Sequence, residues 1–192
     1  MSQVGMLLVF PCSAGHVKGD GGHAPIDGYD PSDPVQHAFL AEFGPKGPHT
    51  LSPEQIDASR YDAVFFVGGH GTMWDFANNR TLAAAPETVA AAGGVIAAVC
   101  HGPSGLVGLQ NSDGSPIVSG KRIAAFTNDE ETAVGLTDVV PFLLADALIE
   151  LGAIHIAAPN FTTNVVVDGQ LITGQNPASA EGVARAIIAK LS

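Results

Sequence analysis

The stretch "GGVIAAVCHGPSGLVG", residues Gly93 to Gly108, joins an apolar run to a cysteine and a histidine. The run Val95–Val99 predicts a buried β-strand, and Pro103 suits the first turn of a helix that follows it. Cys100 is therefore expected at a strand-to-helix turn. Free backbone N–H groups at a helix N-terminus lower the pKa of a thiol. Two interpretations stay open for this position, a nucleophilic thiol and a small buried core residue.

Composition bounds the class of protein. The chain has 192 residues, of which 46% are hydrophobic, and this predicts a single globular domain spanning residues 1–192. A net charge of −11 argues against nucleic acid and anionic membranes as partners. Cys12 and Cys100 are too few for a disulfide framework, and no stretch has the roughly 18 apolar residues of a membrane span. A cytoplasmic protein is expected.

The pattern along the chain predicts strands that alternate with helices. Strands are predicted over Val4–Phe10, in "DAVFFVGG", over Val95–Val99, in "PIVSGKRIAAF" around a Ser119–Gly120 turn, and in "NVVVDGQLIT" around an Asp168–Gly169 turn. Helices are predicted over His37–Phe43, from the N-cap Ser52, and over Thr81–Ala92, Gly102–Leu109, Val139–Leu151 and Asn176–Leu191. The Gly-, Pro- and Asp-rich segment Ser13–Pro34 is expected to be a loop. This order predicts an α/β sandwich around a mainly parallel sheet.

A candidate site lies at the carboxyl ends of two of these strands, where open α/β sheets bind ligands. "VGGHGTMWDF" follows one strand and "CHGPSG" follows the next. Gly68 and Gly69 let the backbone pass close to a bound atom, although such a pair also suits an ordinary tight turn. Beside a helix-terminal Cys100, they suggest an oxyanion hole made by the N–H groups of Gly69 and His101.

A nucleophilic thiol needs a base, and the base needs a carboxylate that orients it. His101 is the candidate base. "FTNDEET" begins as another strand ends, so either Glu130 or Glu131 is a candidate partner for His101. Acidic residues also favour the solvated first turn of a helix, and spacing alone does not decide between these roles.

The remaining candidate residues carry less information. His70 has no assigned role, and Met73 and Trp74 fit either a pocket wall or the core. His16, His23 and His37 lack the short spacing of a metal site, so no metal is predicted.

The stretches "YDAVFFVGGHGTMWDF", "AAVCHGPSGL", "KRIAAFTNDEE" and "LITGQNPASA" together resemble the ThiJ/PfpI superfamily, in its branch of stress-inducible, cofactor-independent glyoxalase III enzymes. The resemblance implies a flavodoxin-like three-layer sandwich and conversion of methylglyoxal to D-lactate without a cofactor. It also implies deglycase or holdase roles in stress protection. Cys100, His101 and Glu131 would be catalytic, and Gly68, Gly69 and His101 would hold the substrate and its oxyanion.

The chain departs from this family at its start. Members continue from the first strand into a helix whose Glu hydrogen-bonds the cysteine, and then into a second strand. Here Ser13–His23 is eleven residues long with four glycines, which is too short and too flexible for both elements. The chain is therefore expected to have a deletion, a different start or a substitute carboxylate. We expect a sluggish thiol, weak activity and a homodimer or higher oligomer.

Three functions are weighed. The first is a glutathione-independent glyoxalase (a lyase of the D-lactate dehydratase type) whose substrate is a small 2-oxoaldehyde. The second is a non-catalytic holdase chaperone or redox-sensing stress protein. A glutamine amidotransferase is disfavoured, since its cysteine pairs with a distant histidine and His155 has only apolar neighbours in sequence.

Overall fold

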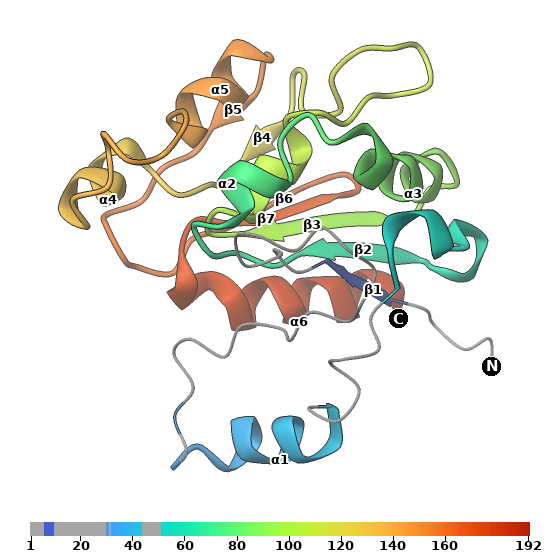
Figure 1. Cartoon of the computed structure of the whole chain (residues 1–192), viewed down its shortest axis with the longest axis horizontal. Helices are drawn as coiled ribbons and strands as arrows, with labels where there is room; N and C mark the ends of the chain where they lie inside the picture. The colour runs from blue at the N-terminus through green and yellow to red at the C-terminus, as the bar shows by residue number, and fades with distance from the viewer. Residues whose placement is uncertain (1–5, 10–29, 31, 44–50) are drawn as a thin grey trace. The chain divides into compact units, whose positions relative to one another are not determined.

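A five-stranded, mainly parallel sheet organises the part of the chain that contains the candidate site (Figure 1). Its strands follow the order β1 (Met6–Val9), β2 (Ala63–Phe66), β3 (Val95–Val99), β7 (Leu171–Gly174) and β6 (Val165–Asp168). The first four run parallel, and β6 pairs with β7 in the antiparallel sense. The computed structural model describes residues 6–9, 30, 32–43 and 51–192.

Helices lie on both faces of this sheet, which gives three layers (Figure 1). On one face α6 (Ala180–Leu191) packs against β3 and β7. The other elements of this part of the chain are η3 (Ala58–Arg60), α2 (Thr72–Asp75), α3 (Arg80–Ala91), η4 (Gly102–Leu106), α4 (Asn128–Ala133), α5 (Leu144–Glu150) and η5 (Pro177–Ser179), with a small parallel sheet of β4 (Arg122–Ile123) and β5 (Ile154–His155). The predicted α/β sandwich is confirmed.

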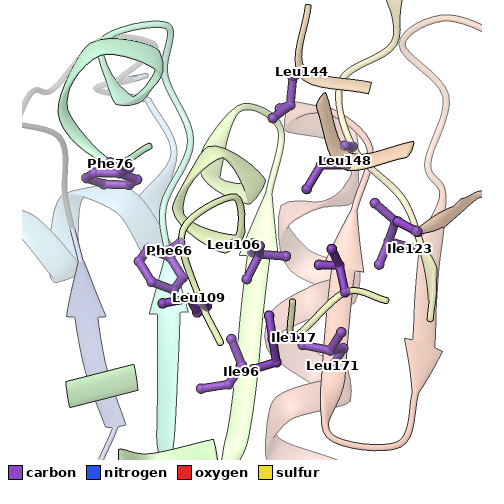
Figure 2. Packing of buried hydrophobic residues seen from close by; sticks show 14 of the residues in the cluster. Phe66, Phe76, Ile96, Leu106, Leu109, Ile117, Ile123, Leu144, Leu148 and Leu171 are labelled. Carbon is purple, nitrogen blue, oxygen red and sulfur yellow. The ribbon is translucent and has the colours of Figure 1, made fainter. Parts of the chain in front are cut away.

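The central strands are apolar throughout because both of their faces are buried. In β2 and β3, alternate side chains point to opposite layers. Val64, Phe66 and Ile96 join Leu106 and Leu148 in one cluster, which Figure 2 shows from close by. A second cluster on the other face contains Ala63, Val95, Ala97 and Val99 together with Val183 and Ile187 of α6. The two clusters fix the sheet, and with it the turns at the carboxyl ends of the strands.

Two compact units are present, residues Met1–Pro11 with Asp57–Ser192 and residues Cys12–Ile56. In the second unit, the predicted helix at His37–Phe43 is confirmed as α1 (Pro34–Phe43), which begins where Asp33 Oδ1 accepts a hydrogen bond from Val35 N. The predicted helix start at Ser52 is a short 3₁₀ turn, η2 (Pro53–Gln55). Most of the predicted loop Ser13–Pro34 lies outside the described residues. The prediction of one domain over residues 1–192 stays a prediction.

Three predicted elements were wrong in part. No hairpin forms around Ser119–Gly120, because Gly120 N bonds Gly152 O and only Arg122–Ile123 forms a strand, paired in parallel with β5. The helix predicted over Val139–Leu151 begins only at Leu144, after Pro141, which has no N–H to donate. The helix predicted over Gly102–Leu109 is the short 3₁₀ segment η4.

The hairpin predicted in "NVVVDGQLIT" is confirmed as β6 and β7. Gly169 takes the positive φ of 61° that its turn requires. Among the described helices, none combines the length and the apolar character needed to cross a bilayer.

Candidate active site

Cys100 sits at a strained turn directly after β3. Its φ of 62° lies in the left-handed region that non-glycine residues rarely adopt. Hydrogen bonds on both sides hold this conformation, since Cys100 N donates to Gly174 O at 2.9 Å and Phe126 N donates to Cys100 O at 3.1 Å. The residue is 8% exposed. The turn is thus over-determined by its neighbours, as at many functional sites.

Two glycines make the sharp turn possible. A Cβ on Gly68 would lie 2.7 Å from Val99 O and 2.8 Å from Cys100 Cβ, so no larger residue fits beside the cysteine. A Cβ on Gly102 would overlap Phe66 O. Both positions bring the turns after β2 and β3 into backbone contact. Of the predicted pair Gly68 and Gly69, Gly68 therefore serves close approach.

Burial raises the pKa of the Cys100 thiol to about 11. The backbone N–H groups of His101 and Gly69 face the sulfur and lower its pKa, but they do not outweigh the loss of water. Negative charge on Glu130 and Glu131 raises it further. Among the described residues, no carboxylate makes a hydrogen bond to this thiol. The thiol therefore stays protonated near neutral pH.

His101 lies between the thiol and a carboxylate. Its Nδ1 is 3.4 Å from Cys100 Sγ, and its Nε2 is 2.7 Å from Glu131 Oε2. The ring is fully buried, and this burial lowers the pKa of His101. A neutral imidazole that donates Nε2–H to Glu131 has its lone pair on Nδ1, facing the thiol. We infer this tautomer from the hydrogen-bond partners.

The structure separates the two candidate carboxylates, Glu130 and Glu131. Glu130 closes the N-terminal turn of α4, where Thr127 N donates to its Oε2 at 3.0 Å. Its Oε1 accepts hydrogen bonds from Phe161 N, Gln175 Nε2 and Asn176 Nδ2. Burial alone would raise the pKa of Glu130, but these hydrogen bonds bring it below the usual value. The carboxylate of Glu130 is thus held by structural hydrogen bonds, and Glu131 is the carboxylate that contacts His101.

His70 is a site residue to which the sequence patterns assign no role. Its Nε2 lies 2.9 Å from Glu131 Oε1, and its ring centroid is 3.9 Å from that of His101. Its side chain is 35% exposed, whereas that of His101 is 0% exposed. One signal could have found it, because β2 and β3 are parallel neighbours and His70 and His101 follow their carboxyl ends. Residues that follow the carboxyl ends of neighbouring parallel strands lie close together at the same edge of the sheet.

Thr72 links the turn after β2 to the turn after β3 through hydrogen bonds. Its Oγ1 lies 2.8 Å from Gly69 O and 2.9 Å from His101 O, and Ser104 Oγ donates to Thr72 O. Gly69 has a φ of 111°, which only glycine tolerates easily. These contacts fix the orientation of the N–H groups that face the sulfur.

Other predicted candidates fall elsewhere. Met73 is buried in the core, and Trp74 is 54% exposed. His37 belongs to the second unit, while Cys12, His16 and His23 lie outside the described residues. Within the described part of the chain, one group of residues could hold a metal ion, namely His70, His101 and Glu131, whose ligand atoms all lie within 4.8 Å of one another.

Known proteins share the sequence family and the fold of this chain. The DJ-1/PfpI family matches residues 43–190. A glutathione-independent glyoxalase of Saccharomyces cerevisiae is 34% identical over 139 residues, which make up 69% of this chain and 59% of that protein. The chain thus spans less than two thirds of the length of this curated relative.

Solved structures resemble the chain closely. The 24 kDa Rapid Encystment Protein of Francisella tularensis is 40% identical with a TM-score of 0.83, over 90% of this chain and 78% of that one. Glyoxalase III of Candida albicans is 30% identical with a TM-score of 0.75, over 82% of this chain and 70% of that one. The chain belongs to the DJ-1/PfpI family, in its glutathione-independent glyoxalase branch.

Proposed function

We propose that this protein is a glutathione-independent glyoxalase that converts methylglyoxal, a small 2-oxoaldehyde, to D-lactate. One observation carries the proposal, the line of contacts from Cys100 Sγ through His101 to Glu131, with distances of 3.4 Å and 2.7 Å. Relatives described as a glutathione-independent glyoxalase and as glyoxalase III support the class of reaction.

The first step is addition of the thiol to the aldehyde. Because the pKa of Cys100 is about 11, the thiol gives up its proton only as it attacks. His101 Nδ1 accepts that proton as a general base, and Glu131 stabilises the resulting imidazolium. An S–C bond forms at the aldehyde carbon, and His101 passes the proton to the carbonyl oxygen. The product is a hemithioacetal, and His101 is neutral again.

The second step moves a proton between neighbouring carbons. His101 removes the proton from C1 of the hemithioacetal, which gives an enediolate, and returns it to C2, while the hydroxyl proton on the C1 oxygen passes to the C2 oxygen. C1 is thereby oxidised to a thioester and C2 is reduced to an alcohol, so no external oxidant or reductant is needed. Water then cleaves the S–C bond, which releases the hydroxyacid and restores the thiol. The balance requires neither an organic cofactor nor a metal.

Two backbone donors support the negative charge that develops on oxygen. The N–H groups of Gly69 and His101 face the sulfur. The substrate oxygen would come within their reach once its carbon is bonded to that sulfur. Such a donor is typically worth about 3–4 kcal/mol in the transition state. The lack of a side chain at Gly68 lets the turn after β2 lie directly against Cys100. The same addition chemistry would serve a deglycase role on glycated adducts.

The second candidate is a holdase chaperone, favoured by the absence of a carboxylate hydrogen-bonded to Cys100 among the described residues. A redox sensor is disfavoured, because sensor thiols have a low pKa and burial raises that of Cys100. Suppression of thermal aggregation of an unrelated enzyme tests the holdase. A holdase keeps this effect in Cys100→Ala, whereas turnover requires the thiol.

The product tests the glyoxalase proposal. The chain is incubated with methylglyoxal in buffer free of glutathione and other thiols, and lactate is measured with D- and L-specific lactate dehydrogenases. D-lactate formed in proportion to protein concentration is expected. Loss of methylglyoxal without D-lactate would mean adduct formation only, and would overturn the proposal.

A further inference from the structure

His70, His101 and Glu131 form a cluster whose donor atoms suit a metal ion. Their ligand atoms lie within 4.8 Å of one another, and the Nε2 atoms of both histidines face the two oxygens of the same carboxylate. The residues come from three segments, namely the turns after β2 and β3 and the first turn of α4. The cluster is therefore assembled by the fold and not by a local sequence motif.

The donor set is that of a zinc-type ion. Two imidazoles and one carboxylate, with a fourth position left for water, make up a recurrent zinc site. Ligand atoms around tetrahedral zinc lie about 3.3 Å apart, since each is about 2.0–2.1 Å from the metal. The contacts of 2.7 Å and 2.9 Å to Glu131 are close to that spacing, so small rotations of the side chains suffice.

Two of the three side chains are buried and preorganised, and the third is partly exposed and gives access to the cluster. The side chains of His101 and Glu131 are 0% and 4% exposed, so they lose little freedom when they bind an ion. The side chain of His70 is 35% exposed and provides the side from which an ion and its water enter. Phe126 packs against the ring of His101, at a centroid distance of 4.3 Å, and limits its rotation.

We propose that His70, His101 and Glu131 bind one divalent ion of the zinc type, and that this ion reversibly blocks the Cys100 site. To bind metal, His101 must offer the lone pair of Nε2, so its proton moves to Nδ1 and points toward Cys100 Sγ. The imidazole then has no lone pair with which to accept the thiol proton. Binding of the ion rests on the cluster alone, whereas the block rests on the proposed glyoxalase function.

Binding is tested by calorimetric titration of chelator-treated protein with zinc chloride, in the Cys100→Ser background so that the thiol contributes no ligand. We expect one site whose affinity falls about 10-fold or more in His70→Asn and in Glu131→Gln. His37→Asn is the matched control, because it removes an exposed histidine of α1 and should leave this site unchanged. Equal affinity in all four proteins would overturn the proposal.

Cobalt(II) titration gives a second readout that does not depend on how stable the variants are. In the unsubstituted protein we expect visible d–d bands without a thiolate charge-transfer band. A charge-transfer band that disappears in Cys100→Ser would place the ion on the thiol instead and would contradict the ligand set. Zinc should also inhibit methylglyoxal turnover, and a chelator should restore it. If zinc binds as described but no turnover occurs without zinc, the proposed function fails while the metal site stands.

Discussion

His101 Nε2 lies 2.7 Å from Glu131 Oε2, and this contact determines which ring nitrogen of His101 faces the thiol. With Nε2–H donated to the carboxylate, Nδ1 is the acceptor 3.4 Å from Cys100 Sγ. A buried thiol with a pKa of about 11 needs such an acceptor close by. In the proposed mechanism, His101 and Glu131 therefore compensate for a thiol that does not ionise by itself.

Glu131→Gln should lower kcat by roughly 100-fold or more, which is the usual contribution of acid–base catalysis. The amide neither holds His101 in the required tautomer nor stabilises its protonated form. Glu130→Gln is the control at the adjacent residue. It should lower kcat less, and it should lower the free energy of unfolding by about 1–3 kcal/mol because buried donors lose a charged acceptor.

Both variants are measured by steady-state kinetics and by denaturant unfolding. If Glu130→Gln lowers kcat as much as Glu131→Gln does, the assignment of the orienting carboxylate is wrong.

Alkylation of Cys100 by iodoacetamide should be slow at neutral pH and should accelerate as the pH rises toward about 11. The sign follows from the thiolate being the nucleophile, since burial raises the pKa and keeps the thiol neutral below it. The rate is followed by mass spectrometry of the Cys100 peptide, with a chelator present. A thiol that titrates well below pH 7 would show that another group stabilises the thiolate.

Gly68→Ala should reduce turnover strongly, because its Cβ would lie 2.8 Å from Cys100 Cβ and 2.7 Å from Val99 O. Gly120→Ala is the control, since Gly120 also has a special conformation, with φ of 71°, but a Cβ at this position would meet no atom within 4 Å. It should cost about 1 kcal/mol of stability through backbone strain and leave kcat unchanged. Equal kcat in Gly68→Ala and in the unsubstituted protein would show that close approach at Gly68 is dispensable.

Self-association stays a prediction, and light scattering coupled to size exclusion measures it. We expect a mass of at least twice the 19.6 kDa of one chain. A monomer at micromolar concentration would contradict this expectation.

The elements predicted best are those whose signal is local. Continuous apolar runs identified β2 and β3, and the Asp168–Gly169 turn identified the hairpin of β6 and β7. The segment after Ser119 was predicted wrongly because its partner, Gly152, is distant in sequence. Pairing of that kind is not visible in a short window of residues.

In the site too, features with a local sequence signal could be predicted, and features that depend on distant residues could not. The place of Cys100 after a buried strand could be predicted from its neighbours, and the contact of the adjacent His101 with the thiol agrees with its choice as the candidate base. Glu130 and Glu131 are adjacent acids in one helical turn, and they differ only in which distant residues they meet. The part played by His70 depends on the pairing of β2 with β3, so it became evident only from the fold.

The most direct test of the central claim compares methylglyoxal turnover by the unsubstituted protein and by Cys100→Ala, without glutathione and with a chelator present. Circular dichroism and the unfolding midpoint establish that the variant is folded. The account predicts D-lactate formation by the unsubstituted protein and only the uncatalysed background with Cys100→Ala. Substantial D-lactate formation by folded Cys100→Ala would contradict the assignment of Cys100 as the nucleophile.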